Sequence, residues 1–366
     1  MTTQLRLTRT ELLAALVLSF AACGTQTASV AQALDQGPCT PVAIESDESD
    51  EDALTARVVV TAGHPVTITG DVDATIDGVT CGIGVYVAPG ARAIIRDADI
   101  HAAETFGVYD QGGDVTIQRS QVRDILGNGE SCGDEEEEGD DGCGGGGGGG
   151  MGGGDDAGYT GGRHGTGVLI VGDGARGMIV ASTITSYGRR GVSVSGPGAN
   201  ARIVNNQIIA PATHASWLNG VWIANGARAT IDNNTISGNL SPPGVGKSSS
   251  AVMLAGGPSH NGMPSFTTDN EIAANRLVDN DTGVLLSNPG LDGTTKVPPP
   301  VVTANHVTGN TITAGAPLAS NDAGANDAGG DGDVIAGNLI SGYGARSIVI
   351  SPYAVETVVG GNQIGE

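Results

Sequence analysis

Carboxylates next to arginines are the side chains of this sequence that could do chemistry. Asp97, Asp99 and Asp110 follow one another closely, and Arg96 and Arg119 lie beside them. Two carboxylates that face one cleft can serve as acid and as base or nucleophile in glycoside hydrolysis. Asp97, Asp99 and Asp110 are therefore the candidate catalytic residues if the protein is an enzyme.

A second acidic group lies near the C-terminus, in the stretch Asp327-Ala328-Gly329-Gly330-Asp331-Gly332-Asp333. Oxygens at alternating positions of an Asp/Gly loop suit Ca²⁺. The stretch lacks the closing Glu of an EF-hand, so a plain turn is the alternative. Asp327, Asp331 and Asp333 are the candidate Ca²⁺ ligands. No other cofactor is expected, because the sequence has no phosphate-binding loop.

Repeated strands must position these side chains, because two patterns recur along the chain. The first pattern is Gly-Val-x-aliphatic, and it or a close variant begins at Gly84, Gly107, Gly167, Gly191, Gly220, Ala251, Gly283 and Ser347. The second is aliphatic-x-x-(Asn or small)-x-aliphatic, and it begins at Ile95, Ile117, Ile179, Ile203, Ile231, Ile272, Val307, Ile335 and Val359. Internal similarity at such intervals predicts a stacked solenoid.

The second pattern holds Asn at one position in its last six copies. These residues are Asn206, Asn234, Asn275, Asn310, Asn338 and Asn362. Asn tolerates the left-handed backbone region and bonds neighbouring backbone, which suits a corner between strands. Side chains stacked at the strand spacing of about 4.8 Å can also bond one another. A stabilising Asn ladder is predicted.

On these two patterns the chain resembles the right-handed parallel β-helix family, the pectate-lyase-like solenoids. The resemblance begins near Val58 and runs to the C-terminus, apart from two insertions. It implies an all-β solenoid of roughly 9–11 coils. Members that cleave polysaccharides carry clustered Asp that bind Ca²⁺ near an Arg, or paired Asp. Asp110 interrupts an aliphatic column here, and such a break can mark a site, but no second coil supplies a matching acid.

The residue after each Gly-Val pair should point outward, since side chains alternate along a strand. This column reads Tyr86, Tyr109, Leu169, Ser193, Trp222, Met253, Leu285 and Val349. A contiguous apolar stripe on a surface suggests a binding face. Tyr86, Tyr109 and Trp222, joined by Trp217, are the candidate residues for stacking on a neutral polysaccharide. The alternative is that the N-terminal tether or an insertion covers the stripe.

The N-terminus reads as an export signal over residues 1–22, with a basic start and a short apolar run. Phe20-Ala21-Ala22-Cys23 resembles a lipobox, which implies lipid attachment at Cys23. Ordinary cleavage after Ala33, with release of a secreted protein, is the alternative. Residues 23–52 then form an acidic tether, residues 53–366 the repeat domain, and residues 126–165 a disordered, Gly-rich acidic insertion.

The other four cysteines favour disulfides in an exported chain. Local pairing joins Cys132 with Cys143 and Cys39 with Cys81, although the sequence does not decide the connectivity. A zinc site is the weaker alternative.

The formal net charge of −23 excludes nucleic acid as a partner and disfavours acidic lipids and polyuronates. Membrane contact is expected only through the lipid anchor. The sequence thus predicts an outer-membrane or cell-surface protein that binds neutral polysaccharide or another surface protein without catalysis. A polysaccharide lyase or glycoside hydrolase is the alternative.

Overall fold

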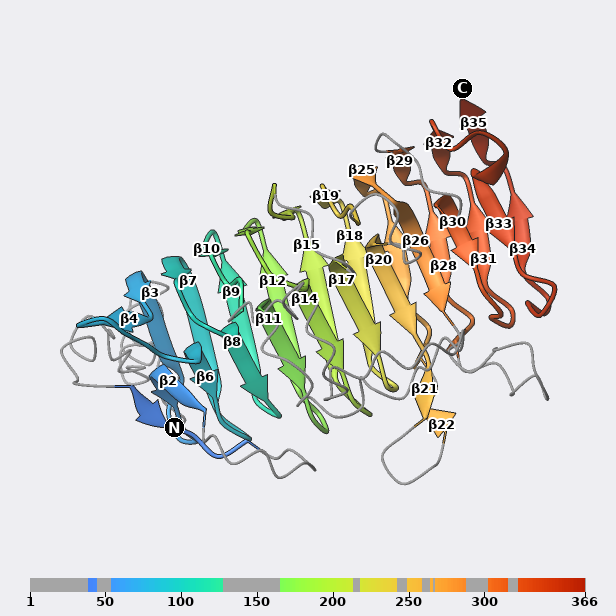
Figure 1. Cartoon of the computed structure of the whole chain (residues 1–366). Helices are drawn as coiled ribbons and strands as arrows, with labels where there is room; N and C mark the ends of the chain where they lie inside the picture. The colour runs from blue at the N-terminus through green and yellow to red at the C-terminus, as the bar shows by residue number, and fades with distance from the viewer. Residues whose placement is uncertain are drawn as a thin grey trace, which may run out of the picture.

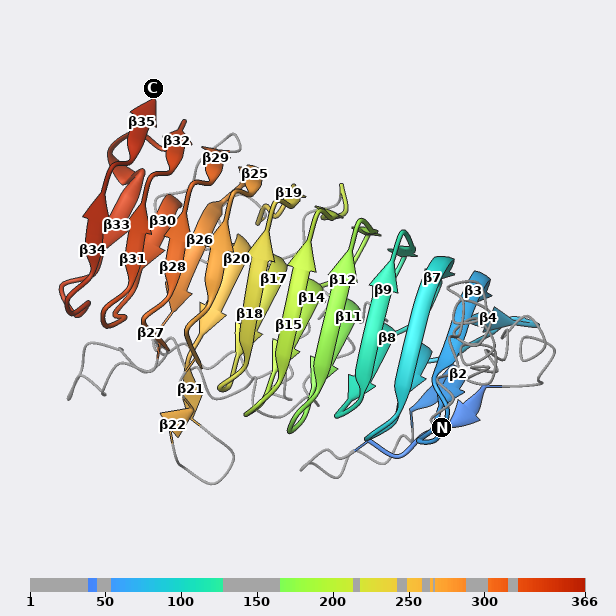
Figure 2. The ribbon, with the colours of Figure 1, turned by 180° about the vertical axis from the view of Figure 1, so that it is seen from behind.

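The computed structural model describes residues 39–44, 54–127, 165–212, 218–241, 249–258, 264–265, 267–287, 302–314 and 322–365. The predicted signal peptide, Cys23, Cys132, Cys143 and Trp217 lie outside the described residues. The described chain forms one elongated stack of strands, with its two ends at opposite ends of the stack (Figures 1 and 2).

Two long sheets run along the stack. The eleven-strand sheet consists, in order, of β1 (Thr40–Pro41), β2 (Thr55–Val60), β6 (Ile83–Val87), β8 (Phe106–Gln111), β11 (Thr166–Val171), β14 (Arg190–Ser195), β17 (Asn219–Ala224), β20 (Ser250–Ala255), β26 (Thr282–Ser287), β30 (Ala323–Asp327) and β33 (Ile348–Ile350). Strand β1 pairs antiparallel with β2, and the ten other strands are parallel.

The eighteen-strand sheet forms the opposite wall. Its strands are β3 (Val66–Asp73), β7 (Arg92–His101), β9 (Asp114–Gln118), β10 (Gln121–Arg123), β12 (Arg176–Val180), β13 (Thr183–Thr185), β15 (Asn200–Val204), β16 (Gln207–Ile209), β18 (Arg228–Asp232), β19 (Thr235–Ser237), β24 (Glu271–Ala273), β25 (Arg276–Asn280), β28 (His306–Thr308), β29 (Thr311–Ala314), β31 (Val334–Ala336), β32 (Leu339–Ser341), β34 (Val358–Gly360) and β35 (Gln363–Gly365). All pair in parallel between successive coils.

Small elements decorate the stack. They are the pairs β4 (Thr75–Ile76) with β5 (Val79–Thr80), β21 (Gly257–Pro258) with β22 (Pro264–Ser265), and β23 (Thr267–Thr268) with β27 (Val302–Thr303), and the 3-10 turn η3 (Gly344–Arg346). Each coil contributes one parallel strand to the eleven-strand sheet. The ten parallel strands of that sheet in the described residues therefore mark ten coils, within the predicted range of roughly 9–11.

The core is a narrow column of aliphatic side chains from both walls. The Val of each Gly-Val pair and the two aliphatic residues of the second pattern are buried, as at Val192, Ile203 and Ile208, except in the last copy, where Val359 and Ile364 are exposed. The residue before the Val is usually glycine for a steric reason. A Cβ on Gly107 would lie 2.4 Å from Cγ1 of Val122 and 2.6 Å from the carbonyl oxygen of Gly167 on the next coil. The side chain of Val122 and the backbone of the next coil thus lie too close to this position for any residue larger than glycine.

The Asn ladder is formed. The Nδ2 of Asn234 donates to Oδ1 of Asn275 at 3.0 Å and to the carbonyl oxygen of Ile203 at 2.8 Å. Its Oδ1 accepts from the backbone N–H and from Nδ2 of Asn206. The same pattern continues through Asn310, Asn338 and Asn362. Each buried amide satisfies backbone groups of neighbouring coils, which is why the column tolerates polar side chains in the interior.

The left-handed residue of each corner is the one before the ladder Asn, which corrects the expectation that the ladder residue itself takes that conformation. Asn205 and Asn233 have φ of 58° and 53°. The equivalent residues on other coils are Asp97, Arg119, Ala181, Ala274, Gly309, Gly337 and Gly361. One corner residue supplies the turn and the next supplies the hydrogen bonds, so the two tasks attributed to one Asn are divided.

Candidate functional site

The outward residues of the eleven-strand sheet form one continuous row in the predicted register. This apolar row consists of Val59, Tyr86, Tyr109, Leu169, Ser193, Trp222, Met253, Leu285, Asn326 and Val349. The sequence patterns missed Val59 and Asn326. The row is not an open surface: Tyr86, Tyr109 and Trp222 are 6%, 2% and 3% exposed.

The N-terminal end of the apolar row is covered by the segment around β1. Val42 and Ile44 pack into a hydrophobic cluster with Tyr86, Tyr109 and Leu169. The hydroxyl of Tyr86 donates to Oε1 of Gln111 at 2.9 Å. The expected disulfide Cys39–Cys81 is present and ties this segment to the first coils. Part of the predicted tether is therefore joined to the fold.

Further along the apolar row, Trp222 is buried as well. The guanidinium of Arg190 lies 3.9 Å from the centre of its ring, a cation–π contact. A sugar that stacked on Trp222 would have to displace Arg190. The burial of these rings removes the exposed stripe on which the sequence-based binding hypothesis depended.

The three candidate catalytic acids do not meet. Asp97 lies at an exposed corner, where its two oxygens accept from Nε and Nη2 of Arg119, each at 2.8 Å. The hydrogen bond from Arg119 lowers the pKa of Asp97. Asp99 lies on the outer face of β7. Asp110 points into the core from the other sheet and is fully buried.

The structure explains why Asp110 interrupts the aliphatic column. Its Oδ1 accepts from the backbone N–H of Gly113 at 2.8 Å. On the preceding coil the equivalent N–H, that of Ala91, donates to the carbonyl oxygen of Ala88. The turn after Asp110 is one residue shorter, so the carboxylate takes the place of that carbonyl. Asp327 occupies the same column and also caps its turn, so Asp110 is not the exception that the sequence suggested.

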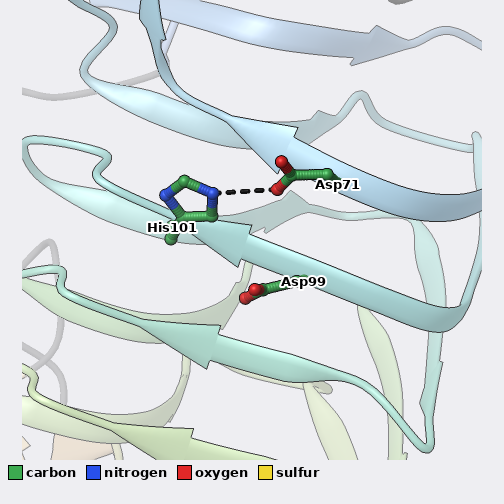
Figure 3. A group of neighbouring side chains, drawn as sticks. All are labelled: Asp71, Asp99 and His101. Carbon is green, nitrogen blue, oxygen red and sulfur yellow. Dashed lines mark hydrogen bonds and ion pairs between the residues drawn. The ribbon is translucent and has the colours of Figure 1, made fainter.

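The acids that do meet lie on the outer face of the eighteen-strand sheet (Figure 3). Asp71 of β3 is the register neighbour of Asp99 on β7. Nε2 of His101 lies 2.8 Å from Oδ1 of Asp71. The ligand atoms of Asp71, Asp99 and His101 lie within 4.8 Å of one another. Among the described residues this is the one group of three or more side chains spaced to hold a metal ion.

Arg123 extends this group to the third coil. Its Nε donates to Oδ1 of Asp99 at 3.0 Å and its Nη2 to Oδ2 at 2.8 Å. Its Nη1 donates to Asp124. The hydrogen bond with Asp99 raises the pKa of Arg123. We call Asp71, Asp99, His101 and Arg123 the outer cluster.

The outer cluster begins a longer row of mostly polar side chains. This polar row consists of Asp71, Asp99, Gln121, Thr183, Gln207, Thr235, Arg276, Thr311, Leu339 and Gln363. All of its members are exposed or partly exposed. The row can offer hydrogen bonds along the whole stack.

Asp71, His101 and Arg123 were not among the residues predicted from the sequence, because the two repeat patterns do not extend to the first coil, where Asp71 lies. A signal was present: the alternating polar residues Asp71 and Asp73, then Asp99 and His101, follow equivalent corners. A bulge between Ile68 and Gly70 shifts the register by one residue and hides the correspondence. The candidate acids could therefore be found, but their partners could not.

Asp327 and Asp333, two of the three sequence-predicted Ca²⁺ ligands, are fully buried. Asp331 is partly exposed, and its backbone bridges to Thr303 and Val355. The three side chains do not form a group of the kind seen at the outer cluster.

Comparisons with known proteins identify the fold. A family model described as "Right handed beta helix region" matches residues 160–325. The chain is a right-handed parallel β-helix. The β-helix is similar to PfbA, a surface adhesin of Streptococcus pneumoniae, with a TM-score of 0.51 and 13% identity over 85% of this chain and 68% of that chain. No curated protein matches the sequence.

Two further structures resemble the β-helix more distantly. The Dettilon tailspike protein has a TM-score of 0.48 and 18% identity over 84% of this chain and 54% of that one. DFA-IIIase from Arthrobacter chlorophenolicus, in complex with GF2, has a TM-score of 0.46 and 12% identity over 83% of this chain and 66% of that one. The β-helix thus spans about half of the tailspike's length. At these identities the likeness concerns the fold alone.

Proposed function

We propose that the protein is an exported, lipid-anchored surface β-helix that binds a neutral glycan without cleaving it. The observation that carries the proposal is the outer cluster at the head of an exposed polar row. The aromatic rings of the apolar row are buried, whereas all members of the polar row are exposed or partly exposed, which favours the face of the eighteen-strand sheet for a ligand.

The chemistry of the outer cluster suits sugar hydroxyls. Asp71 is 71% exposed, and Asp99 and Arg123 are each 36% exposed. Carboxylates accept and guanidinium groups donate charge-assisted hydrogen bonds, which are stronger than neutral ones. Asp71 and Asp99 are already oriented by His101 and Arg123, so little side-chain entropy is lost on binding. The net charge of −23 favours neutral over acidic glycans.

Export is supported by the N-terminal sequence and by the disulfide Cys39–Cys81, because such bonds persist in oxidising compartments. No helix in the described residues is long and apolar enough to cross a membrane. Attachment at Cys23 would then hold the protein at a membrane surface. A Cys23→Ser variant expressed with the full chain tests this: it should leave the membrane fraction.

The second candidate function is hydrolysis or elimination of a polysaccharide. The proximity of Asp71 and Asp99 favours it, since two carboxylates on neighbouring coils are the minimum such chemistry needs. Against it, Asp99 is held by Arg123 in a bidentate ion pair. The two acids with raised pKa values, Asp110 and Asp333, are buried away from any substrate. The geometry therefore supports binding better than catalysis.

The test is a screen of the purified full-length protein against immobilised neutral and acidic glycans, with product analysis in parallel. We expect binding to neutral glycans without cleavage, and a loss of affinity of about tenfold in Arg123→Ala. Arg202→Ala, an exposed arginine of β15 outside both the outer cluster and the polar row, is the matched control. Glycan cleavage that Asp99→Asn abolishes would establish the enzyme instead. Binding that Arg123→Ala leaves intact would remove the outer cluster from the site.

A further inference from the structure

Two buried carboxylates share the interior of the C-terminal coils. Asp327 ends β30 and points inward, between Leu286 and Ile350 of the neighbouring coils. Asp333 immediately precedes β31. Each has an exposed fraction of 0%. Ionised carboxylates are almost never buried unless something compensates their charge.

Three of the four carboxylate oxygens have donors. Oδ1 of Asp327 accepts from the N–H groups of Gly329 and Gly330, at 3.1 and 2.7 Å. Its Oδ2 accepts from the hydroxyl of Thr357. Oδ1 of Asp333 accepts from the backbone N–H and Nδ2 of Asn305, at 2.7 and 3.0 Å. Oδ2 of Asp333 is buried and has no hydrogen-bond partner.

The unpartnered oxygen points towards the other acid. A Cβ on Gly330 would lie 1.8 Å from Oδ2 of Asp333 and 3.1 Å from Oδ1 of Asp327. Both carboxylates therefore border the space beside one glycine, and any side chain there would collide with them.

The local charge is uncompensated. Within the described residues, the recorded salt bridges include none to Asp327 or Asp333. One proton would neutralise one of these acids and leave the others charged. A divalent cation would neutralise two.

We propose that Asp327 and Asp333 hold a hard divalent cation, Ca²⁺, inside the C-terminal coils. Oδ2 of Asp333 and the carboxylate of Asp327 are the charged ligands. The hydroxyl of Thr357, which contacts Asp327, is a further oxygen, and water would complete the six to eight oxygens that Ca²⁺ takes. Asp331 contributes long-range charge and is not a ligand. The ion would join the ninth and tenth coils, because Thr357 lies just before β34.

The test is thermal unfolding of the full-length protein after removal of metal with EDTA, with CaCl₂ then added and ionic strength held constant by NaCl. Calcium should raise the midpoint by on the order of 4 °C at a hundred times its dissociation constant. Titration calorimetry should show a site that Asp333→Asn removes. This substitution keeps the acceptor for Asn305 and removes the charge, so the variant should fold and lose the calcium shift.

Two control variants test whether the calcium shift comes from Asp327 and Asp333. Asp71→Asn removes a ligand of the outer cluster and should retain the calcium shift. Asp110→Asn changes a buried acid that caps a similar turn without a second acid beside it, and should also retain the shift. Calcium stabilisation that survives in Asp333→Asn would overturn the proposal. So would the absence of any calcium effect in the wild type, with lower pH alone stabilising it, since a proton would then occupy the site.

Discussion

The outward rows of the two long sheets have opposite characters. On the eleven-strand sheet the row through Tyr109 and Trp222 is mostly apolar, its aromatic rings are buried, and its N-terminal end packs against the segment around β1. On the eighteen-strand sheet the row through Asp99 and Arg276 is polar and reaches solvent. Strand geometry is the same in both cases, so alternation alone does not say which outward face is a surface.

The difference also assigns different tasks to similar residues. A large apolar side chain in the covered row belongs to the core and contributes to stability. A polar side chain in the open row is free to meet a ligand. Substitutions in the two rows should therefore separate stability from binding, and the following experiments use that contrast.

The largest expected effect is that of Trp222→Ala. Trp222 is 3% exposed and packs under Arg190, so its removal should lower the free energy of unfolding by about 3–5 kcal/mol in urea denaturation. Met178→Ala, on the open sheet at 41% exposure, is the control and should change it by less than about 1 kcal/mol. Equal effects of the two substitutions would mean that the apolar row is an exposed face after all.

Asp110→Asn should change the pH dependence of stability. Burial raises the pKa of Asp110 to about 7, above its usual value of 3.8. Stability from this group is therefore complete below about pH 4 and is lost as the pH rises to 7, by roughly 3 kcal/mol. Asn cannot ionise and still accepts the N–H of Gly113, so the variant should lack this loss. Urea denaturation between pH 4.5 and 7.5 measures it. Glu271→Gln, at an exposed position of β24, should keep the wild-type slope, and a D110N slope equal to the wild type would contradict the burial argument.

Asn234→Leu should lower the free energy of unfolding by about 1–3 kcal/mol. The substitution leaves the amide of Asn206 and the carbonyl oxygen of Ile203 without their partners. Gln207→Leu places the same side chain at an exposed position of the neighbouring strand and should be nearly neutral. An unchanged melting midpoint in Asn234→Leu would refute the stabilising role of the ladder.

The smallest effect should come from Arg119→Ala. Its ion pair with Asp97 is bidentate, but both side chains are about half exposed. Exposed pairs contribute little to stability, and salt weakens them. Chemical denaturation at low and high NaCl measures the difference, with exposed Arg202→Ala as the control. A larger, salt-independent loss would show that Arg119 does more than pair with Asp97.

The coils could be predicted in detail because each one repeats the same local physics. Val and Ile at fixed spacings, a small residue before the Val and an Asn after the corner are visible in the sequence and reappear in the structure as core and ladder. The sequence misplaced the left-handed residue by one position, since Asn205 and Asn206 are adjacent and chemically equal candidates. Burial against the neighbouring coils separates them: Asn206 is buried and bonds Asn234 inside the stack, whereas Asn205 is exposed.

The outer cluster could be predicted only in part. Asp99 was a candidate because of its acidic neighbours, but its contact with Asp71 crosses a coil and follows a register shift. Asp110 was a candidate for a different reason, because it interrupts an aliphatic column. The sequence could not show whether such an acid serves catalysis or caps a turn. The shortened turn that explains Asp110 becomes visible only when the coils are aligned in space.

The sequence alone determined the coil, its core and its ladder, because those interactions join equivalent residues of successive repeats and so leave a periodic signal. The tertiary structure alone decided which outward row is covered and which carboxylates meet. Val42 and Ile44 cover Tyr86 from outside the repeat, and His101 reaches Asp71 on the neighbouring coil. Such contacts occur once, depend on loop lengths and register, and therefore have no period that a sequence could display.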